Sequence, residues 1–101
     1  MKSLSKFCLG MTLLIFLAGC GKSPGPLEGE WNAIGPLPFK VVFRHGETEA
    51  MGMIEHVSYH IDGNIVTVTY TDGVMKGAAI RYTMVDRNTA KNPMVTLKRI
   101  R

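Results

Sequence analysis

The sequence predicts a small all-β domain, an antiparallel meander of about six strands that curls into a barrel or a sandwich. From Leu27 onward the apolar residues follow a period of two, which is typical of half-buried strands. Turn-forming residues interrupt this pattern about every 8 to 12 positions. No stretch after Leu27 shows the apolar period of an amphipathic helix. With 101 residues, the chain has room for one domain.

Residues 1–19 are predicted to form a removable export signal. Lys2 and Lys6 give the chain a positively charged start, and residues 7–18 continue as a mostly apolar run. This run is shorter than the roughly 20 apolar residues that a bilayer-spanning helix needs. We therefore expect a cleaved signal and no permanent membrane span. Cys8 would leave with the signal, so Cys20 would have no disulfide partner.

The run ends in Leu17-Ala18-Gly19-Cys20, which resembles the lipobox of bacterial lipoprotein precursors. The resemblance implies cleavage between Gly19 and Cys20 and lipidation of the Cys20 thiol. Two or three acyl chains hold a protein stably on a membrane. In lipoproteins of enteric-type bacteria, the absence of Asp at the position of Gly21 implies the outer membrane, here facing the periplasm. The alternative is an ordinary cleavable signal in which Cys20 is incidental.

The mature chain is predicted to begin with the lipidated Cys20 and a flexible tether, residues 20–26. The segment Gly21-Lys22-Ser23-Pro24-Gly25-Pro26 is expected to form neither a helix nor a β-ladder. Extended, the tether would reach roughly 20 Å from the lipid surface. The folded domain is expected to cover residues 27–101. Without the signal, ten Lys and Arg residues face eight Asp and Glu residues, a net charge of +2. Such a weak charge gives no reason to expect nucleic acid as a partner.

Within residues 27–101, the strands are expected where apolar and polar residues alternate. The turn Asp62-Gly63-Asn64 predicts a tight hairpin, because Gly and Asn tolerate positive φ angles. The polar run 87–93 is expected to be a loop. The six expected strands are Glu30–Ala33, Phe39–Phe43, Met53–Ile61, Ile65–Thr71, Ala78–Met84 and Met94–Ile100.

The two ends of this domain resemble short lipocalin-like lipoprotein domains. The resemblance is carried by Leu27, Gly29 and Trp31 near the start and by Leu97-Lys98-Arg99 near the end. A full lipocalin barrel has eight strands around a ligand cavity, whereas six short strands would fill their interior with side chains. Transport of a small apolar ligand is therefore kept as an alternative function. It requires an open apolar interior.

Arg44-His45-Gly46-Glu47-Thr48 resembles the signature of the histidine phosphatase and phosphoglycerate mutase family. The resemblance implies that His45 accepts a phosphoryl group and that Arg44 holds phosphate oxygens. Such chemistry needs further donors brought round the phosphate by a substantial α/β scaffold. Only 55 residues follow Gly46, and their pattern predicts hairpins. We therefore expect a polar hairpin loop and no catalytic residues, with a phosphatase-like enzyme as the alternative.

His56 and His60 are the candidates for a metal site. On a strand, four residues separate them by roughly 13 Å, which is too far for one ion. We therefore expect two solvated histidines, no metal and no cofactor.

Basic residues form a candidate binding surface for anionic lipid headgroups or an acidic partner. An alternative interpretation is that they protect an exposed edge strand from unwanted pairing. The residues are Arg81, Arg87, Lys98, Arg99 and Arg101.

Together these observations predict a non-enzymatic, membrane-anchored bacterial lipoprotein. Its small β-domain would contact another envelope component, a protein or a glycan, in an assembly, exclusion or structural role.

Overall fold

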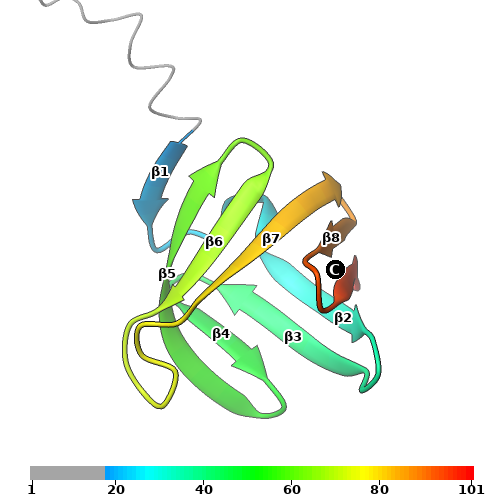
Figure 1. Ribbon diagram of the computed structural model, residues 1–101, viewed down its shortest axis with the longest axis horizontal. Helices are drawn as coiled ribbons and strands as arrows, with labels where there is room; N and C mark the ends of the chain where they lie inside the picture. The colour runs from blue at the N-terminus through cyan, green and yellow to red at the C-terminus, as the bar shows by residue number, and fades with distance from the viewer. Residues whose placement is uncertain (1–17) are drawn as a thin grey trace, which may run out of the picture.

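The computed structural model describes residues 18–101, which form a closed antiparallel β-barrel (Figure 1). The all-β, antiparallel prediction is confirmed. The predicted export signal lies outside the described residues except for Ala18 and Gly19. The described elements are β1 (Ala18–Gly21), the 3-10 helix η1 (Gly25–Leu27), β2 (Gly29–Ile34), β3 (Phe39–Arg44), β4 (Glu47–Ala50), β5 (Met53–Asp62), β6 (Ile65–Tyr70), β7 (Ala79–Asp86), β8 (Thr89–Lys91) and β9 (Thr96–Arg99).

The barrel is an up-and-down meander of eight strands. Each strand from β2 to β8 pairs with the next one along the chain, and β9 returns to pair with β2. In that closing ladder Trp31 lies opposite Arg99 and Ala33 opposite Leu97. Closure leaves the barrel strands with few free edges, which is how up-and-down barrels avoid edge pairing. Among residues 18–101, no helix is long and apolar enough to cross a membrane.

The strand number differs from the prediction of about six. The six expected strands correspond to β2, β3, β5, β6, β7 and β9, while β1, β4 and β8 were not expected. β4 has the sequence Glu-Thr-Glu-Ala, and β8 is only three residues long. Neither shows the apolar alternation that marks a strand in a sequence. Both become strands because the neighbouring strands on each side supply hydrogen-bonding partners.

The segment predicted as a flexible tether is packed against the barrel in its described part. Gly21 pairs with Tyr59 in the ladder between β1 and β5, and Cys20 pairs with His60. Pro24 is buried, and the amide of Gly46 donates a hydrogen bond of 2.8 Å to the carbonyl of Lys22. The expectation that residues 21–26 form neither a helix nor a ladder is therefore wrong: Gly25 and Pro26 lie in η1, and Gly21 lies in the ladder with β5. The physical reason is that β4 pairs only with the first part of β5, which leaves the edge at residues 59–62 for β1.

The interior of the barrel is occupied by side chains. Eight strands give an interior just wide enough for side chains to fill. Phe43 and Tyr82 meet edge to face across it, with ring centroids 5.6 Å apart. The fully buried large side chains are Trp31, Tyr59, Phe43, Leu27, Leu97, Val57, Val66, Val68 and Pro24.

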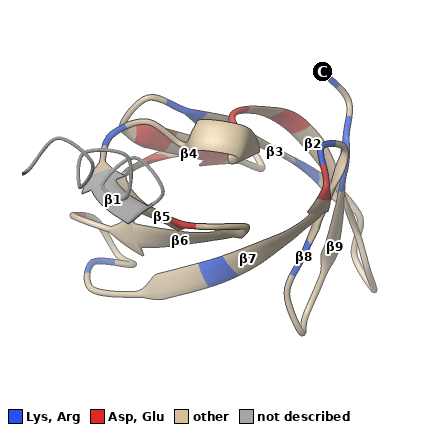
Figure 2. Cartoon of the chain, turned by 90° about the horizontal axis from the view of Figure 1, so that it is seen from above, with Lys and Arg blue, Asp and Glu red and all other residues tan. Residues whose placement is uncertain are grey.

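The two ends of the barrel differ. One end, called the η1 end here, carries η1, the turns at residues 45–46, 63–64 and 87–88, and the C-terminus. The other, called the loop end, carries the connections 35–38, 51–52, 71–78 and 92–95. Figure 2 shows the ring of strands from above. Because β1 pairs with the last residues of β5, the chain enters the barrel beside the η1 end.

Candidate functional site

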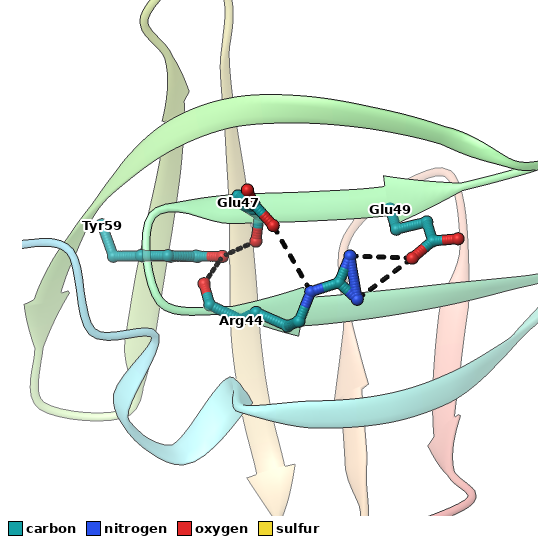
Figure 3. Close-up of polar contacts among 4 residues, drawn as sticks. All are labelled: Arg44, Glu47, Glu49 and Tyr59. Atoms are coloured by element: carbon teal, nitrogen blue, oxygen red, sulfur yellow. Dashed lines mark hydrogen bonds and ion pairs between the residues drawn. The ribbon is translucent and has the colours of Figure 1, made fainter.

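The segment that resembles the phosphatase signature forms the hairpin between β3 and β4. Arg44 pairs with Glu47, and Gly46 has the positive φ of 71° that favours glycine. Two guanidinium nitrogens of Arg44 donate to Oε1 of Glu49 at 3.0 and 2.8 Å, and its Nε lies 3.5 Å from Oε1 of Glu47 (Figure 3). The guanidinium that the resemblance assigns to phosphate is thus held by two carboxylates of the same hairpin. His45 is exposed at the tip.

Tyr59 holds this hairpin from inside the barrel. Its hydroxyl lies 2.9 Å from the carbonyl of Arg44 and 2.7 Å from the carbonyl of Glu47, so its single proton is shared between them (Figure 3). Burial raises the pKa of Tyr59. The hairpin is also tied to β5, because Val57 donates to the carbonyl of Gly46 at 3.0 Å. The segment therefore has a structural role at the point where β5 changes partner from β4 to β1.

The two candidate metal ligands are separate. His56 and His60 both lie on β5, and Nδ1 of His56 is 3.2 Å from Oδ2 of Asp72. In the ladders, His60 lies opposite Cys20 on one side and Thr67 on the other. Among the side chains of residues 21–101, no group of three or more His, Cys, Asp or Glu is placed to hold a metal ion.

The predicted basic surface is divided. Arg87, Arg99 and Arg101 lie at the η1 end, whereas Arg81 lies in the half of β7 nearest the loop end. Lys98 is on the outside of β9, where its Nζ donates to Oγ1 of Thr89 at 3.1 Å. Basic residues are accordingly scattered over several strands in Figure 2. The five residues do not form one continuous patch.

Arg99 has a structural role at the η1 end. Its guanidinium lies over the Trp31 ring, 4.3 Å from the centroid. Nη1 donates to the carbonyl of Glu28 at 2.7 Å, Nη2 to that of Pro26 at 2.8 Å, and Nε to that of Arg87 at 2.9 Å. The indole nitrogen of Trp31 donates in turn to the carbonyl of Leu27 at 2.9 Å. The two chain ends that carry the lipocalin-like resemblance therefore meet at the η1 end.

Arg101 is bound to the first strand of the barrel. Its Nη2 lies 3.3 Å from Oε1 of Glu30, and Nζ of Lys40 lies at the same distance from that oxygen. The hydrogen bond from Arg101 is the main reason that the pKa of Glu30 is lowered. Arg101 and Arg99 thus secure the C-terminal residues to β2 and η1.

Apolar side chains are exposed mainly at the loop end. Eight of the ten exposed large hydrophobic residues among residues 18–101 lie there, and Val85 and Ile100 are the other two. The exposed side chains reach 96% accessibility at Val74 and 84% at Met94. A concentration of this kind marks an interaction surface more often than scattered single residues do. The eight are Ile34, Leu37, Met51, Met53, Ile54, Val74, Met75 and Met94.

A cleft of about 380 Å³ opens within this end, between the connections 35–38 and 92–95. Its walls are predominantly apolar, with Phe39, Ile80 and Tyr82 at the base and Leu37 and Met94 at the rim. The sequence pattern predicts none of these residues as a site, because Phe39, Ile80, Tyr82 and Met94 lie in expected strands and Leu37 lies between two of them. The available signal was a large apolar residue at a break between two expected strands, as at Leu37.

The chain matches no protein-family model, and no curated protein or solved structure resembles it closely enough to indicate a relationship.

Proposed function

We propose that the chain is a non-enzymatic bacterial lipoprotein, anchored by acylated Cys20 and contacting another envelope component through the loop end. The anchor is inferred from the lipobox-like sequence Leu17-Ala18-Gly19-Cys20. The contact is inferred from the exposed apolar side chains, which gather at the end of the barrel opposite the one where the chain enters. An anchor at the η1 end directs the loop end away from the lipid, toward the periplasm if the membrane is the outer one.

A protein is the better candidate than a glycan for this contact. The rim of the loop end is formed by Leu37, Met51, Val74 and Met94, all exposed. Burial of apolar area is the main driving force of most protein–protein association, at about 25 cal/mol per Å². Adaptable methionine side chains suit such a surface.

Site-specific crosslinking in the source cells tests this proposal. A photo-crosslinking residue at Met94 is expected to capture a discrete envelope protein, whereas the same residue at Val85, which is exposed near the η1 end, is expected not to. Mass spectrometry is expected to find the mature N-terminus at Cys20 with acyl chains. In Cys20→Ser the chain should lose its membrane fractionation and its crosslink. An unacylated native N-terminus, or equal capture from Met94 and Val85, would refute the proposal.

The phosphatase alternative is tested by one assay. The pairing of Arg44 with Glu47 and Glu49 supports a structural role for the signature-like segment. Wild type and His45→Ala are both expected to show no turnover of a generic phosphomonoester. Turnover by the wild type that is lost in His45→Ala would replace the contact model by an enzyme.

A second candidate function is binding of a small apolar ligand in the cleft at the loop end. It differs from the carrier expected from the sequence, which requires an open apolar interior, because side chains occupy the interior of the barrel. The cleft volume of about 380 Å³ is within the range of small-molecule sites. The fluorescence of an environment-sensitive apolar dye, added to the full chain in nanodiscs, measures binding of a small apolar molecule in the cleft. Saturable dye binding that is lost in Ile80→Asp would support a small-ligand carrier. Equal dye binding by empty nanodiscs would rule the carrier out.

A further inference from the structure

The barrel wall has a gap between β7 and the turn that follows β8. β7 pairs with β6 from Ala79 to Thr83, but with β8 only at Thr83, Met84 and Asp86. β8 ends at Lys91, after which residues 92–95 turn away toward β9. Ala79–Tyr82 therefore have a ladder neighbour on only one side among the described residues. At about 3.3 Å per residue, this open edge is roughly 13 Å long.

The direction of the hydrogen bonds shows which backbone groups face the gap. Met84 donates to the carbonyl of Asn64 at 2.7 Å, and Tyr70 donates to the carbonyl of Ala78 at 2.9 Å. Even-numbered residues of this strand thus turn their polar groups toward β6. Alternate residues in a strand address opposite neighbours. The amide and carbonyl groups of Ala79 and Arg81 therefore point into the gap.

The gap is lined differently on its two sides. On the inner side lies the apolar cleft, with Phe39, Ile80 and Tyr82. On the outer side lies a groove of about 710 Å³ that includes Thr67, Arg81 and Thr83. Ile80, Asn92 and Met94 line both hollows, so the two meet through the gap. A strand placed there would direct alternate side chains into the cleft and into the groove.

The outer side of the gap is basic. Arg81 is exposed in the groove, and Lys91 is exposed at the end of β8. Within residues 18–101 neither forms an ion pair, and the groove has no acidic residue in its lining. A side chain pointing outward from an added strand would be favoured if it were acidic.

We propose that an extended segment of another envelope protein adds as a strand to the open edge of β7. It forms backbone hydrogen bonds with Ala79 and Arg81, places apolar side chains in the cleft against Ile80 and Tyr82, and directs an acidic side chain toward Arg81. This is strand addition, in which backbone bonds supply affinity and side-chain pockets supply specificity. The inference rests on the proposed function, since it names the chemistry of the partner that the loop end contacts.

A second copy of this chain is a poorer occupant. A symmetric dimer through this edge is isologous, so it would pair Ala79–Tyr82 of one copy with the same residues of the other. In the register centred on Arg81 the two Arg81 side chains lie directly opposite each other, and in the register centred on Ile80 they are diagonal neighbours. Both registers bring like charges within reach of each other, which is destabilising.

Hydrogen exchange on the full chain in lipid nanodiscs tests the open edge. In the free protein the amides of Ala79 and Arg81 are expected to exchange much faster than those of Ile80 and Tyr82. Equal protection of the four amides would overturn the proposal, because it would show that the edge is already covered. Self-association of the chain that protects Ala79 and Arg81 would overturn it too, because the occupant would be a second copy.

The probe for binding is an acetylated, amidated peptide with alternating Val and Glu residues. It is expected to slow exchange at Ala79 and Arg81. Arg81→Glu should weaken its binding about tenfold, which corresponds to about 1.4 kcal/mol, and should favour the matching Val and Lys peptide. Lys76→Glu, an equal change of charge on the same end but outside the gap, is the control and should bind like the wild type. A Val and Glu peptide with N-methylated backbone should not bind.

Two results overturn strand addition: no slowing at Ala79 and Arg81 with the Val and Glu peptide, or equal binding of its N-methylated form. The crosslinking experiment then separates the two proposals. A specific crosslink from Met94 without peptide binding would leave the proposed function standing and remove the strand-addition inference. Peptide binding by a chain that is not acylated in the cell would remove the proposed function and leave strand addition standing.

Discussion

The guanidinium of Arg99, on the last strand of the barrel, lies 4.3 Å from the centre of the Trp31 ring on the first. The same guanidinium donates to three carbonyl groups, of Pro26, Glu28 and Arg87. One side chain therefore joins η1, both closing strands and the turn before β8. The η1 end is held by this contact, whereas the loop end has no equivalent among the described residues.

Replacing Arg99 is expected to destabilise the barrel. Arg99→Ala removes three hydrogen bonds and the contact with Trp31, each worth about 1 kcal/mol net, so the free energy of unfolding should fall by about 4 kcal/mol. Arg99→Lys keeps the charge but not the planar fork, and should recover less than half of the loss. Urea denaturation measures both. Arg87→Ala, which keeps the carbonyl, is the control. An equal loss in the two alanine variants would contradict the role given to Arg99.

Tyr59→Phe is expected to loosen the hairpin between β3 and β4. Removing the hydroxyl leaves the carbonyls of Arg44 and Glu47 without this donor, at a cost of about 1 to 2 kcal/mol. Hydrogen exchange at the amide of Gly46 should accelerate more than exchange in β7. In Tyr82→Phe the change should stay below about 0.5 kcal/mol, because the Tyr82 hydroxyl has no hydrogen bond among the described residues. Similar losses in both variants would argue against the anchoring of the hairpin.

Gly29→Ala is expected to disturb the chain end. Gly29 has a φ of 129°, and a Cβ there would meet the carbonyl oxygen of Arg101 and approach Nη1 of Arg99 to 2.7 Å. Strain and displacement together should cost at least about 2 kcal/mol. Gly63→Ala is the matched control, because its φ is also positive, at 62°, but nothing lies within 4 Å of its Cβ position. If thermal unfolding shows that Gly29→Ala and Gly63→Ala are equally stable, the close approach at Gly29 does not contribute to stability.

Stability is expected to fall at high pH. Burial raises the pKa of Tyr82 to about 12 and also raises that of Tyr59. In the unfolded chain both tyrosines ionise near pH 10. Below pH 10 the phenol protons are bound in both the folded and the unfolded state, so the full free energy of unfolding is retained. As the pH rises from 10 toward 12, the phenols ionise only in the unfolded state, and the free energy of unfolding falls. The free energy of unfolding at pH 8, 10 and 11 should therefore decrease, and less steeply in Tyr82→Phe. A flat profile would contradict the burial of both phenols.

The strand pattern was predictable wherever one face of a strand is buried. Val66 and Val68 in β6 alternate with threonines and are buried in the core. Val41 and Phe43 in β3 are likewise buried, on the face opposite Lys40, Val42 and Arg44. β8 is not predicted as a strand because its one buried apolar residue, Ala90, is small and lies among polar residues in a run that resembles a loop. Only its neighbours β7 and β9 make it a strand.

The candidate site was harder to predict. The loop end is assembled from four connections far apart in the sequence, so residues such as Leu37 and Met94 become neighbours only after the barrel closes. The gap beside Ala79 and Arg81 depends on where β8 ends, and element ends are poorly marked by sequence patterns. Arg99 was assigned to a binding surface because nothing in a sequence states which side chain will reach Trp31.

The closing ladder between β2 and β9 has a consequence for biosynthesis. Trp31 and Arg99 are the first and last partners to be made, so a nascent chain halted before residue 96 can form only an open, unclosed sheet. The unpaired edges of that sheet would favour aggregation. Truncated products that lack only the four residues of β9 should therefore stay open and prone to aggregate.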